Sequence, residues 1–405
     1  MKPSNDPFVA LAQEWIGQLD TWVDTHGLCG YDPFDVKQHP FIRNAQSSYF
    51  KRKLTSGLCD LAPYASRRLL KIAPTENAKS HALMALGRMR LYELDEGEEQ
   101  LELAKGHLAW LKANALVDFG GLCWGYPFST EAKGLVTTKD TPVLVVSAIA
   151  GEAFLAMYAL TKEEEYLADA RRIAQFILDD LPRMEQGNGQ YCFSYTPGDR
   201  RRVHNANLMA VHHLMAVAVH TDEDDLREAA APALAYTLGC QHTDGAWYYG
   251  EWDETEPFEQ GILNMIDHHH TGFVLRSLSA IHDITGDKKQ LESIRKGFTY
   301  FRNYLTEGEY CVPVNSYGKY PIDIHACAEG ILCPSVLTGK VMIARGMAGQ
   351  MLRWTHWEMR DKKTGAPYYR KYPKFKSKLI CPRWGVAWMF RAMAEYLYVH
   401  YKDGE

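Results

Sequence analysis

Residues that could do chemistry recur where segments with helical spacing are expected to begin. Carboxylates and imidazoles can move protons, and guanidinium, amide and indole groups can hold a ligand that is rich in oxygen atoms. The set consists of His204, Asn205, Asn207, Asp267, His270, Asp323, His325, Glu329, Arg383 and Trp384. Capping of the first backbone N–H groups of a helix is the simpler interpretation of Asp267 and Asp323, and a capping residue can also be catalytic.

Carboxylates in different environments would suit the cleavage of a glycosidic bond. The positive end of a helix dipole favours the ionised forms of Asp267 and Asp323, so both suit the role of a base or a charge stabiliser. A glycosidase also needs a protonated carboxylic acid, whose pKa is raised by apolar surroundings. Glu251 follows a Trp-Tyr-Tyr run and is the first candidate for that acid, with Glu329 as the second.

Histidine offers a different reaction. His204, His270 or His325 could remove the C5 proton of a uronic acid, and so could a tyrosine. Arg383 or Asn205 would then hold the carboxylate of the substrate. This chemistry would make the protein a lyase or an epimerase.

The motifs indicate no metal and no cofactor. Three consecutive histidines, from His268 to His270, point in different directions at a helix start, and no H-E-x-x-H motif accompanies them. The sequence has no G-x-G-x-x-G, P-loop or G-x-S-x-G motif in a strand-to-helix setting. We therefore expect neither a metal ion nor an organic cofactor.

Aromatic residues are unusually frequent, with 23 Tyr, 15 Phe and 10 Trp. They gather in short segments that begin at Gly121, Gly189, Gly245, Gly308 and Gly365. Their rings could stack on the C–H faces of sugars, whose hydroxyl groups would take hydrogen bonds nearby. The residues expected at such a cleft are Trp124, Tyr126, Tyr195, Trp247 and Tyr249. Bracing of the loops is the alternative role for each of these rings.

Paired helical segments repeat along the chain and predict an all-α fold. Their first members begin near residues 141, 204, 267, 321 and 383, at a step of roughly 60 residues. The first helix of each pair is apolar on most faces, whereas the second carries a one-sided apolar stripe, so we expect an inner and an outer ring. The prediction is an (α/α)6-type toroid formed by residues 1–405 as one domain, with the aromatic loops at one mouth.

Composition argues against several classes of partner. The formal net charge is -5 and no basic run occurs, which disfavours nucleic acid. No stretch of about 18 uncharged apolar residues occurs, so we expect no membrane span. The N-terminal residues lack the basic and apolar regions of a secretory signal, and the nine cysteines form no C-x-x-C pair. We therefore expect a cytoplasmic protein without a disulfide framework.

Eight sequence blocks occur in order between residue 124 and the C-terminal region. They are Trp124-Gly-Tyr-Pro-Phe, Phe193-Ser-Tyr-Thr-Pro, Val203-His-Asn-Ala-Asn-Leu, Asp244-Gly-Ala-Trp-Tyr-Tyr-Gly-Glu, Ile266-Asp with His270-Thr-Gly-Phe, Tyr320-Pro-Ile-Asp-Ile-His, Tyr368-Tyr-Arg-Lys-Tyr-Pro and Arg383-Trp-Gly-Val-Ala-Trp-Met. Together they resemble the VpsJ-type proteins encoded among bacterial exopolysaccharide and capsule biosynthesis genes. The resemblance implies a six-hairpin toroid and a role in glycan metabolism, without a settled reaction.

The chain departs from that family's pattern at two places. The family continues after the first block with an Asp-Trp-Gln-Ser-Arg-like stretch, where this chain has Ser129-Thr-Glu-Ala-Lys. The family's Asp-Asn-Phe-His stands here as Asp267-His-His-His, which indicates that Asp267 and His270 matter most. The Asp244-Gly-Ala-Trp turn also resembles the repeat of terpene-cyclase toroids, but the sequence has no Asp-rich diphosphate site.

The sequence is compatible with three functions, each of them directed at a glycan. The first expectation is a hydrolase that uses Asp267 or Asp323 with a protonated Glu251 or Glu329. The second is a uronate lyase or C5-epimerase, and the third is a non-catalytic glycan-binding or assembly subunit. In the cytoplasm the partner would be an oligosaccharide or a lipid-linked unit, with or without uronic acid, rather than a finished polysaccharide.

Overall fold

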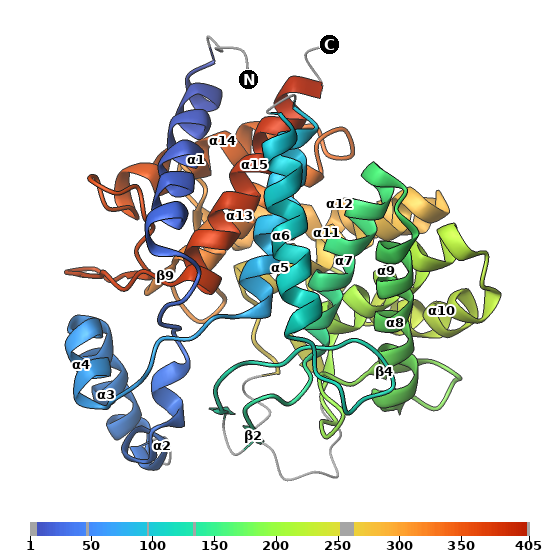
Figure 1. Cartoon of the computed structure of the whole chain (residues 1–405), viewed down its shortest axis with the longest axis horizontal. Helices are drawn as coiled ribbons and strands as arrows, with labels where there is room; N and C mark the ends of the chain where they lie inside the picture. The colour runs from blue at the N-terminus through green and yellow to red at the C-terminus, as the bar shows by residue number, and fades with distance from the viewer. Residues whose placement is uncertain (1–5, 46–47, 95–96, 133–134, 252–262, 403–405) are drawn as a thin grey trace.

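Six apolar helices close into an inner ring. The computed structural model describes residues 6–45, 48–94, 97–132, 135–251 and 263–402. Within these ranges each inner helix packs against the next one in sequence, and the last packs against the first. They are α5 (Ala78–Tyr92), α7 (Leu144–Thr161), α9 (His204–Thr221), α11 (His268–Thr285), α13 (Ile324–Val336) and α15 (Ala387–Lys402) (Figure 1).

A second layer of helices covers this ring. Its members are α6 (Glu98–Ala113), α8 (Glu164–Asp180), α10 (Asp224–Gly239), α12 (Lys288–Tyr304) and α14 (Ala344–Glu358), and each packs against the inner helix before it. The N-terminal helix α1 (Pro7–His26) packs against α15 and α14 and so completes the outer layer. The all-α, (α/α)6-type toroid is therefore confirmed, with α1 as the outer partner of the last inner helix.

Small residues let the inner helices approach closely. A β-carbon at Gly151 of α7 would lie 2.3 Å from the ring of His213 on α9, so only glycine fits there. The inner helices are buried on most faces, whereas α8 and α12 bury one stripe. One apolar core extends from Val9 to Leu397. The assignment of the whole chain to one domain stays a prediction.

Short antiparallel strands lie in the connections between the helices. The two-stranded pairs are β1 (Thr130–Ala132) with β2 (Leu135–Thr137), β3 (Arg183–Glu185) with β4 (Tyr191–Phe193), β5 (Arg202–Val203) with β6 (Gly250–Glu251), and β7 (Thr306–Glu307) with β8 (Val312–Pro313). A three-stranded sheet has the order β11 (Lys376–Ser377), β10 (Arg370–Lys371), β9 (Ile322–Asp323). β5 and β9 run directly into α9 and α13, so strand pairing fixes where these inner helices begin.

The residues between Gly30 and Thr75 form a small lobe outside the ring. Two backbone hydrogen bonds, of 3.0 and 2.9 Å, join Gly30 to Thr75 and so hold the two ends of the lobe together. The lobe contains η1 (Asp35–Gln38), α2 (Pro40–Ala45), α3 (Tyr49–Leu61) and α4 (Pro63–Leu69) (Figure 1). It has an apolar cluster of its own, formed by Val36, Ile42, Cys59 and Ile72.

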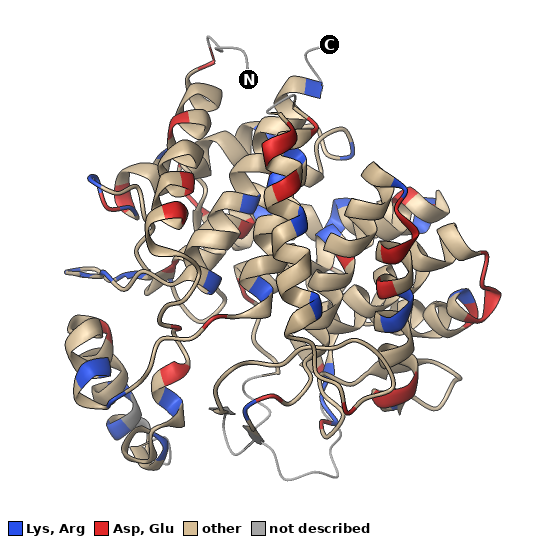
Figure 2. Cartoon of the chain, viewed as in Figure 1, with Lys and Arg blue, Asp and Glu red and all other residues tan. Residues whose placement is uncertain are grey.

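One inner helix has the length and composition of a membrane span. α7 is long and apolar enough to cross a membrane, with a mean hydropathy of 1.7, but 67% of this window is buried inside the protein. Its position in the inner ring explains that composition, because the helix packs against α5, α8 and α9. Acidic and basic residues are interspersed over the rest of the ribbon, and the β10–β11 hairpin is basic (Figure 2).

Candidate functional site

The first residues of the inner helices and the loops before them enclose a cavity of about 540 Å³. The helices α5, α9, α11 and α13 contribute Lys79, Asn205, His269, His270 and His325 to its polar lining. Apolar surface comes from Phe34, Met209 and Phe273, among others. The cavity therefore offers a ligand both rings to stack on and polar groups to bind.

Three equivalent tyrosines line the cavity, but the tryptophans of the same loops do not. Tyr126, Tyr195 and Tyr249 face it, whereas Trp124 and Trp247 are buried at 2% exposure each. The indole nitrogens donate hydrogen bonds of 2.9 Å to backbone carbonyls of α6 and α10. Each Trp precedes its Tyr by two residues. The tryptophans therefore brace the loops, and the expectation that they bind substrate is corrected.

One carboxylate holds two histidines at the start of α11. Asp267 accepts a hydrogen bond from the backbone N–H of His270 (2.9 Å) and so caps the helix. Its second oxygen lies 2.6 Å from Nδ1 of His270, and its first lies 3.3 Å from Nδ1 of His269. All three residues line the cavity. Since a carboxylate only accepts, Nδ1 of His270 carries a proton, and Nε2 has the lone pair when the ring is neutral.

The charges of this cluster follow from burial and from its contacts. Burial alone would raise the pKa of Asp267, but the two imidazoles and the hydrogen bonds from His270 lower it well below its ordinary value. Burial lowers the pKa of His269 to about 4 despite the neighbouring Asp267. At neutral pH Asp267 is therefore a carboxylate and His269 a neutral imidazole.

Asp323 is fully engaged by neighbouring donors. Its oxygens accept hydrogen bonds from the indole of Trp384 (2.7 Å), the backbone N–H of His325 (3.0 Å) and the guanidinium of Arg370 (2.9 Å). The ring of His325 stacks on Trp384, with centroids 4.1 Å apart. Burial lowers the pKa of His325 well below its ordinary value, so the ring is neutral. Asp323 lines the cavity, and its contacts suit the positioning of His325 and Trp384.

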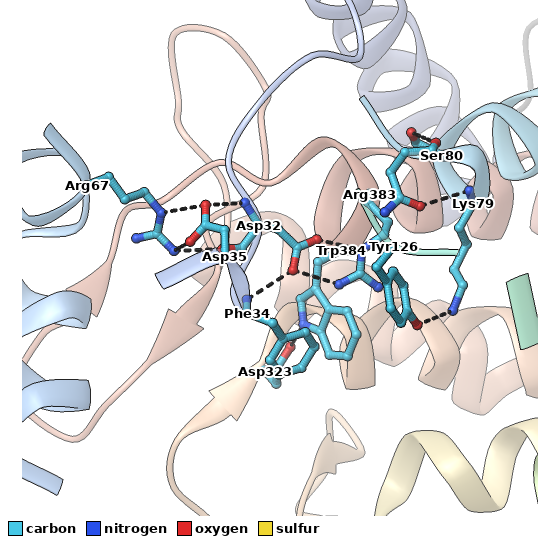
Figure 3. Close-up of polar contacts among 11 residues, drawn as sticks. Asp32, Phe34, Asp35, Arg67, Lys79, Ser80, Tyr126, Asp323, Arg383 and Trp384 are labelled. Atoms are coloured by element: carbon cyan, nitrogen blue, oxygen red, sulfur yellow. Dashed lines mark hydrogen bonds and ion pairs between the residues drawn. The ribbon is translucent and has the colours of Figure 1, made fainter. Parts of the chain in front are cut away.

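A tyrosine and a lysine form a second reactive pair in the lining. Nζ of Lys79 lies 3.3 Å from the hydroxyl of Tyr126, and the guanidinium of Arg383 lies 5.1 Å from its ring (Figure 3). Burial would raise the pKa of Tyr126, but these two cations lower it below its ordinary value. Burial in turn lowers the pKa of Lys79. The Tyr126 hydroxyl can therefore give up its proton more easily than the hydroxyl of an ordinary tyrosine.

Arg383 lies beside the ring of Tyr126 but does not line the cavity. It is 3% exposed and binds both oxygens of Asp32 in the lobe, at 2.5 and 2.8 Å. The network continues as Asp35 binds Arg67, which also donates to the backbone carbonyl of Asp32 (Figure 3). The expected role of Arg383 in binding a substrate carboxylate is corrected, because its guanidinium is buried outside the cavity lining and binds Asp32 through Nε and Nη2.

The two acids expected for hydrolysis lie outside the cavity lining. Glu251 faces His204 instead, and its pKa is lowered by this histidine against the effect of burial, so it is a carboxylate. Glu329 is fully buried and binds the guanidinium of Arg276 at 2.6 Å. Burial raises the pKa of Glu329 to about 7. The charged groups needed for cleavage are therefore not brought together in the way the sequence suggested.

Two further residues expected at the site point elsewhere. Asn207 is fully buried, donates to the backbone of Ala233 (2.7 Å) and accepts from the backbone of Phe193 (3.0 Å). His204 is also fully buried and turns its ring towards Thr237 of α10. Both begin α9 beside Asn205, which does line the cavity. Their roles as substrate ligand and catalytic base are corrected.

The lining contains cations that the sequence interpretation had not placed at the site. Lys37, Lys79, Arg201 and Arg370 line the cavity together with the carboxylates Asp267 and Asp323. Arg201 and Arg370 lie within the sequence blocks or beside them, so their positions gave a usable signal. No such signal marks Lys79, because the start of α5 is not preceded by a loop with a glycine and an aromatic cluster. This balance of charges suits a ligand with acidic groups or a negative charge that develops during reaction.

One group at the cavity has donor atoms that a metal ion could use. Ligand atoms of Asp267, His269 and His270 lie within 4.8 Å of one another. The direct contact of 2.6 Å between Asp267 and His270 already accounts for these positions as a hydrogen bond. A second such group, outside the cavity lining, consists of His204, Cys240 and Glu251.

Comparison with known proteins identifies the fold. No family model and no curated protein matches the sequence. Cellobiose 2-epimerase from Bacillus thermoamylovorans B4167 is similar in structure, with a TM-score of 0.66 at 10% identity over 96% of this chain and 98% of that one. D-mannose isomerase has a TM-score of 0.66 at 11% identity, and an unsaturated glucuronyl hydrolase specific for heparin one of 0.65 at 12% identity. Both of these cover 98% of this chain and 99% of their own. The chain thus shares the toroid fold of these carbohydrate-processing enzymes.

Proposed function

We propose that the protein is a sugar epimerase or isomerase that removes and returns a proton at a carbon atom beside a carbonyl group. The observation that carries the proposal is the 2.6 Å contact between Asp267 and Nδ1 of His270 at the cavity wall. This contact leaves Nε2 of His270 available as a base, and Asp267 stabilises the imidazolium that forms. The proteins of similar fold include a sugar epimerase, a cellobiose 2-epimerase and D-mannose isomerase, which supports a sugar as substrate.

The reaction would proceed by two proton transfers at carbon, the removal and the return of one proton. His270 takes the proton from the substrate carbon, the C–H electrons form a carbon–carbon double bond, and negative charge moves to the former carbonyl oxygen. The cations Lys79 and Arg201, which line the same cavity, stabilise that charge. A proton from the Tyr126 hydroxyl or from a protonated His270 then returns to carbon. Return of the proton to the opposite face of the same carbon gives the epimer. Return to the former carbonyl carbon gives the isomer, and the hydroxyl proton of the first carbon then passes to the former carbonyl oxygen.

Hydrolysis has weaker support from the same cavity. A glycosidase needs a carboxylic acid that is protonated at the cleft. In the lining that the structure describes, the carboxyl groups are Asp267, which is ionised, and Asp323, which already accepts three hydrogen bonds. Glu251 and Glu329 lie outside the lining.

A uronate lyase or C5-epimerase is the second candidate function. It would use the same histidines and Tyr126 as acid and base, and Arg201 and Arg370 would bind the substrate carboxylate. A polysaccharide lyase is also among the proteins of similar fold. The basic side chains of the cavity favour this candidate over hydrolysis.

The cellular role follows from the sequence resemblance and stays part of the proposal. The likeness to VpsJ-type proteins suggests a step in the synthesis of exopolysaccharide or capsule. All nine cysteines are unpaired in the structure, which suits a reducing cytoplasm. The substrate would then be a free oligosaccharide or a lipid-linked precursor.

A product screen tests the proposal. The purified protein is incubated with neutral and uronic-acid-containing mono- and oligosaccharides, and the products are separated and identified by NMR. An epimer or a ketose of unchanged mass supports the proposed function. A product with a C4–C5 double bond transfers the assignment to the lyase. New reducing ends would assign the protein as a hydrolase. Binding without any product across the panel would favour a glycan-binding subunit.

A further inference from the structure

Three potential metal ligands meet outside the cavity, between the inner and outer rings. They are Nε2 of His204 at the start of α9, Sγ of Cys240 at the end of α10 and a carboxylate oxygen of Glu251 in β6. These atoms lie within 4.8 Å of one another. The distance from Nε2 of His204 to Oε1 of Glu251 is 3.8 Å. It is too long for a hydrogen bond, but ligands around a tetrahedral zinc ion lie roughly 3.3–3.8 Å apart.

The buried Nε2 atom of His204 lacks a hydrogen-bond partner among the described residues. The residue has 0% exposure. Its Nδ1 lies 3.4 Å from Oγ1 of Thr237, which also accepts from Asn207. Such a contact on the other ring nitrogen is how proteins orient a metal-binding imidazole. Leaving a buried polar atom unpaired costs free energy, and a cation on Nε2 would remove that cost.

We propose that His204, Cys240 and Glu251 bind one zinc ion. Thiolate, imidazole and carboxylate are the ligand types that zinc takes in proteins, and a fourth position is left for water. The side chain of Glu251 is 38% exposed, so the ion can enter from solvent. Zinc binds cysteine as the thiolate, so binding displaces the thiol proton of Cys240 and releases it to solvent.

The ion would join three elements that shape one wall of the cavity. His204 precedes Asn205, and Glu251 follows Tyr249 by two residues in the strand that pairs with β5. Asn205 and Tyr249 both line the cavity. Zinc would therefore fix the distance between α9, β6 and the end of α10, and with it the position of these two side chains.

Zinc content and cobalt absorption test the site directly. Protein treated with EDTA is titrated with Zn²⁺, and bound metal is measured after gel filtration. We expect one zinc per chain, release of about one proton per zinc, and a thiolate-to-cobalt charge-transfer band when Co²⁺ replaces zinc. Cys240→Ala abolishes the band. Cys311→Ala, a change of another half-buried cysteine, leaves it intact.

A milder variant keeps the test valid if Cys240→Ala does not fold. Glu251→Gln changes a part-exposed carboxylate to its isostere and should weaken zinc binding at least tenfold with an unchanged circular dichroism spectrum. Binding of less than about 0.2 zinc per chain by the wild type would overturn the proposal. So would a cobalt complex without a thiolate band, since the ion would then sit at Asp267, His269 and His270.

Discussion

His270 takes its proposed role from one contact. Asp267 lies 2.6 Å from its Nδ1 and also caps the helix that carries it, so a single carboxylate fixes both the backbone and the ring. The sequence predicted a capping carboxylate here and singled out Asp267 and His270. It could not predict that His269 would reach the same carboxylate, at 3.3 Å, because that depends on the side-chain torsions at the first turn.

The substitution Asp267→Asn tests the contact. Asparagine can still cap α11, but it cannot stabilise an imidazolium, so we expect turnover to fall roughly 10²- to 10⁴-fold with little loss of stability. Steady-state rates on the substrate found in the product screen provide the measurement. Asp287→Asn, which changes the capping residue of α12 away from the cavity, is the control and should keep full activity. Equal rates for both variants would remove Asp267 from the mechanism.

The buried carboxyl of Glu329 predicts a dependence of stability on pH. Its pKa in the folded protein is raised to about 7 by burial, so the folded state holds a proton that the unfolded chain releases near pH 4.5. The resulting stabilisation is present below about pH 4.5 and is lost as pH rises through about 7.

Glu329→Gln, which cannot ionise, should therefore lose less stability than the wild type between pH 5 and pH 8. The expected difference in the change of unfolding free energy is on the order of 1–3 kcal/mol, measured by urea denaturation at both pH values. Glu165→Gln, on the exposed side of α8, should follow the wild type. If the wild type and Glu329→Gln change in parallel, the carboxyl of Glu329 is not protonated near neutral pH.

At the scale of elements, two of the aromatic loops use one ring to anchor the loop and another ring to line the cavity. Side chains two apart in the loops face different environments, so Tyr126 and Tyr249 line the cavity while Trp124 and Trp247 anchor the loop to an outer helix. The sequence predicted that these loops would gather at one mouth. It did not resolve which ring would face the ligand, because both are aromatic and both follow the same glycine.

Two conservative substitutions separate these roles. Trp247→Phe removes the 2.9 Å hydrogen bond to the carbonyl of Thr237 and some packing, so we expect a loss of about 1–3 kcal/mol in unfolding free energy. Tyr249→Phe keeps the ring and removes the hydroxyl of a side chain that lines the cavity. It should leave stability nearly unchanged and raise KM about 2- to 10-fold. The reverse pattern would mean that Trp247 binds the ligand.

The lobe is the element that the sequence did not predict. One of its attachments is Asp32, whose carboxylate binds Arg383 next to Tyr126 (Figure 3). Hydrogen bonds of Asp60 with Tyr372 and of Tyr64 with the backbone of Ile380 are others. The pair of Asp32 and Arg383 joins residues 351 positions apart in the sequence, so spacing gave no signal of it. Phe34, next to Asp32 in the chain, lines the cavity. The lobe therefore supports the site as well as covering it.

Asp32→Ala should weaken this attachment strongly. It leaves Arg383 buried without its carboxylate, and breaking such a pair costs about 3–5 kcal/mol. We expect that loss in urea denaturation, together with faster proteolysis of the lobe. Asp24→Ala, which removes an exposed carboxylate on α1, is the control and should change stability by less than about 0.5 kcal/mol. A small effect of Asp32→Ala would mean that the lobe is held mainly by its contacts at Asp60 and Tyr64.

At the scale of the whole molecule, ring closure brings together residues from both ends of the chain. The repeat of roughly 60 residues predicted the inner and outer rings, and the ring of six confirms the toroid. The N-terminal hairpin lacks the glycine and aromatic signal, so Lys79 was not found although it lies beside Tyr126. Closure between α15 and α5 brings Arg383, which precedes α15, and Lys79 of α5 close to that tyrosine.

Exchange of solvent deuterium into the sugar tests the central claim most directly. Wild type and His270→Gln are incubated with the sugar substrate in D₂O, and carbon-bound deuterium is measured by NMR and mass spectrometry. The proposed reaction predicts deuterium at the carbon beside the carbonyl, with a rate that His270→Gln lowers at least 100-fold. Conversion of substrate without carbon-bound deuterium, or exchange at the same rate in His270→Gln, would contradict proton abstraction by His270.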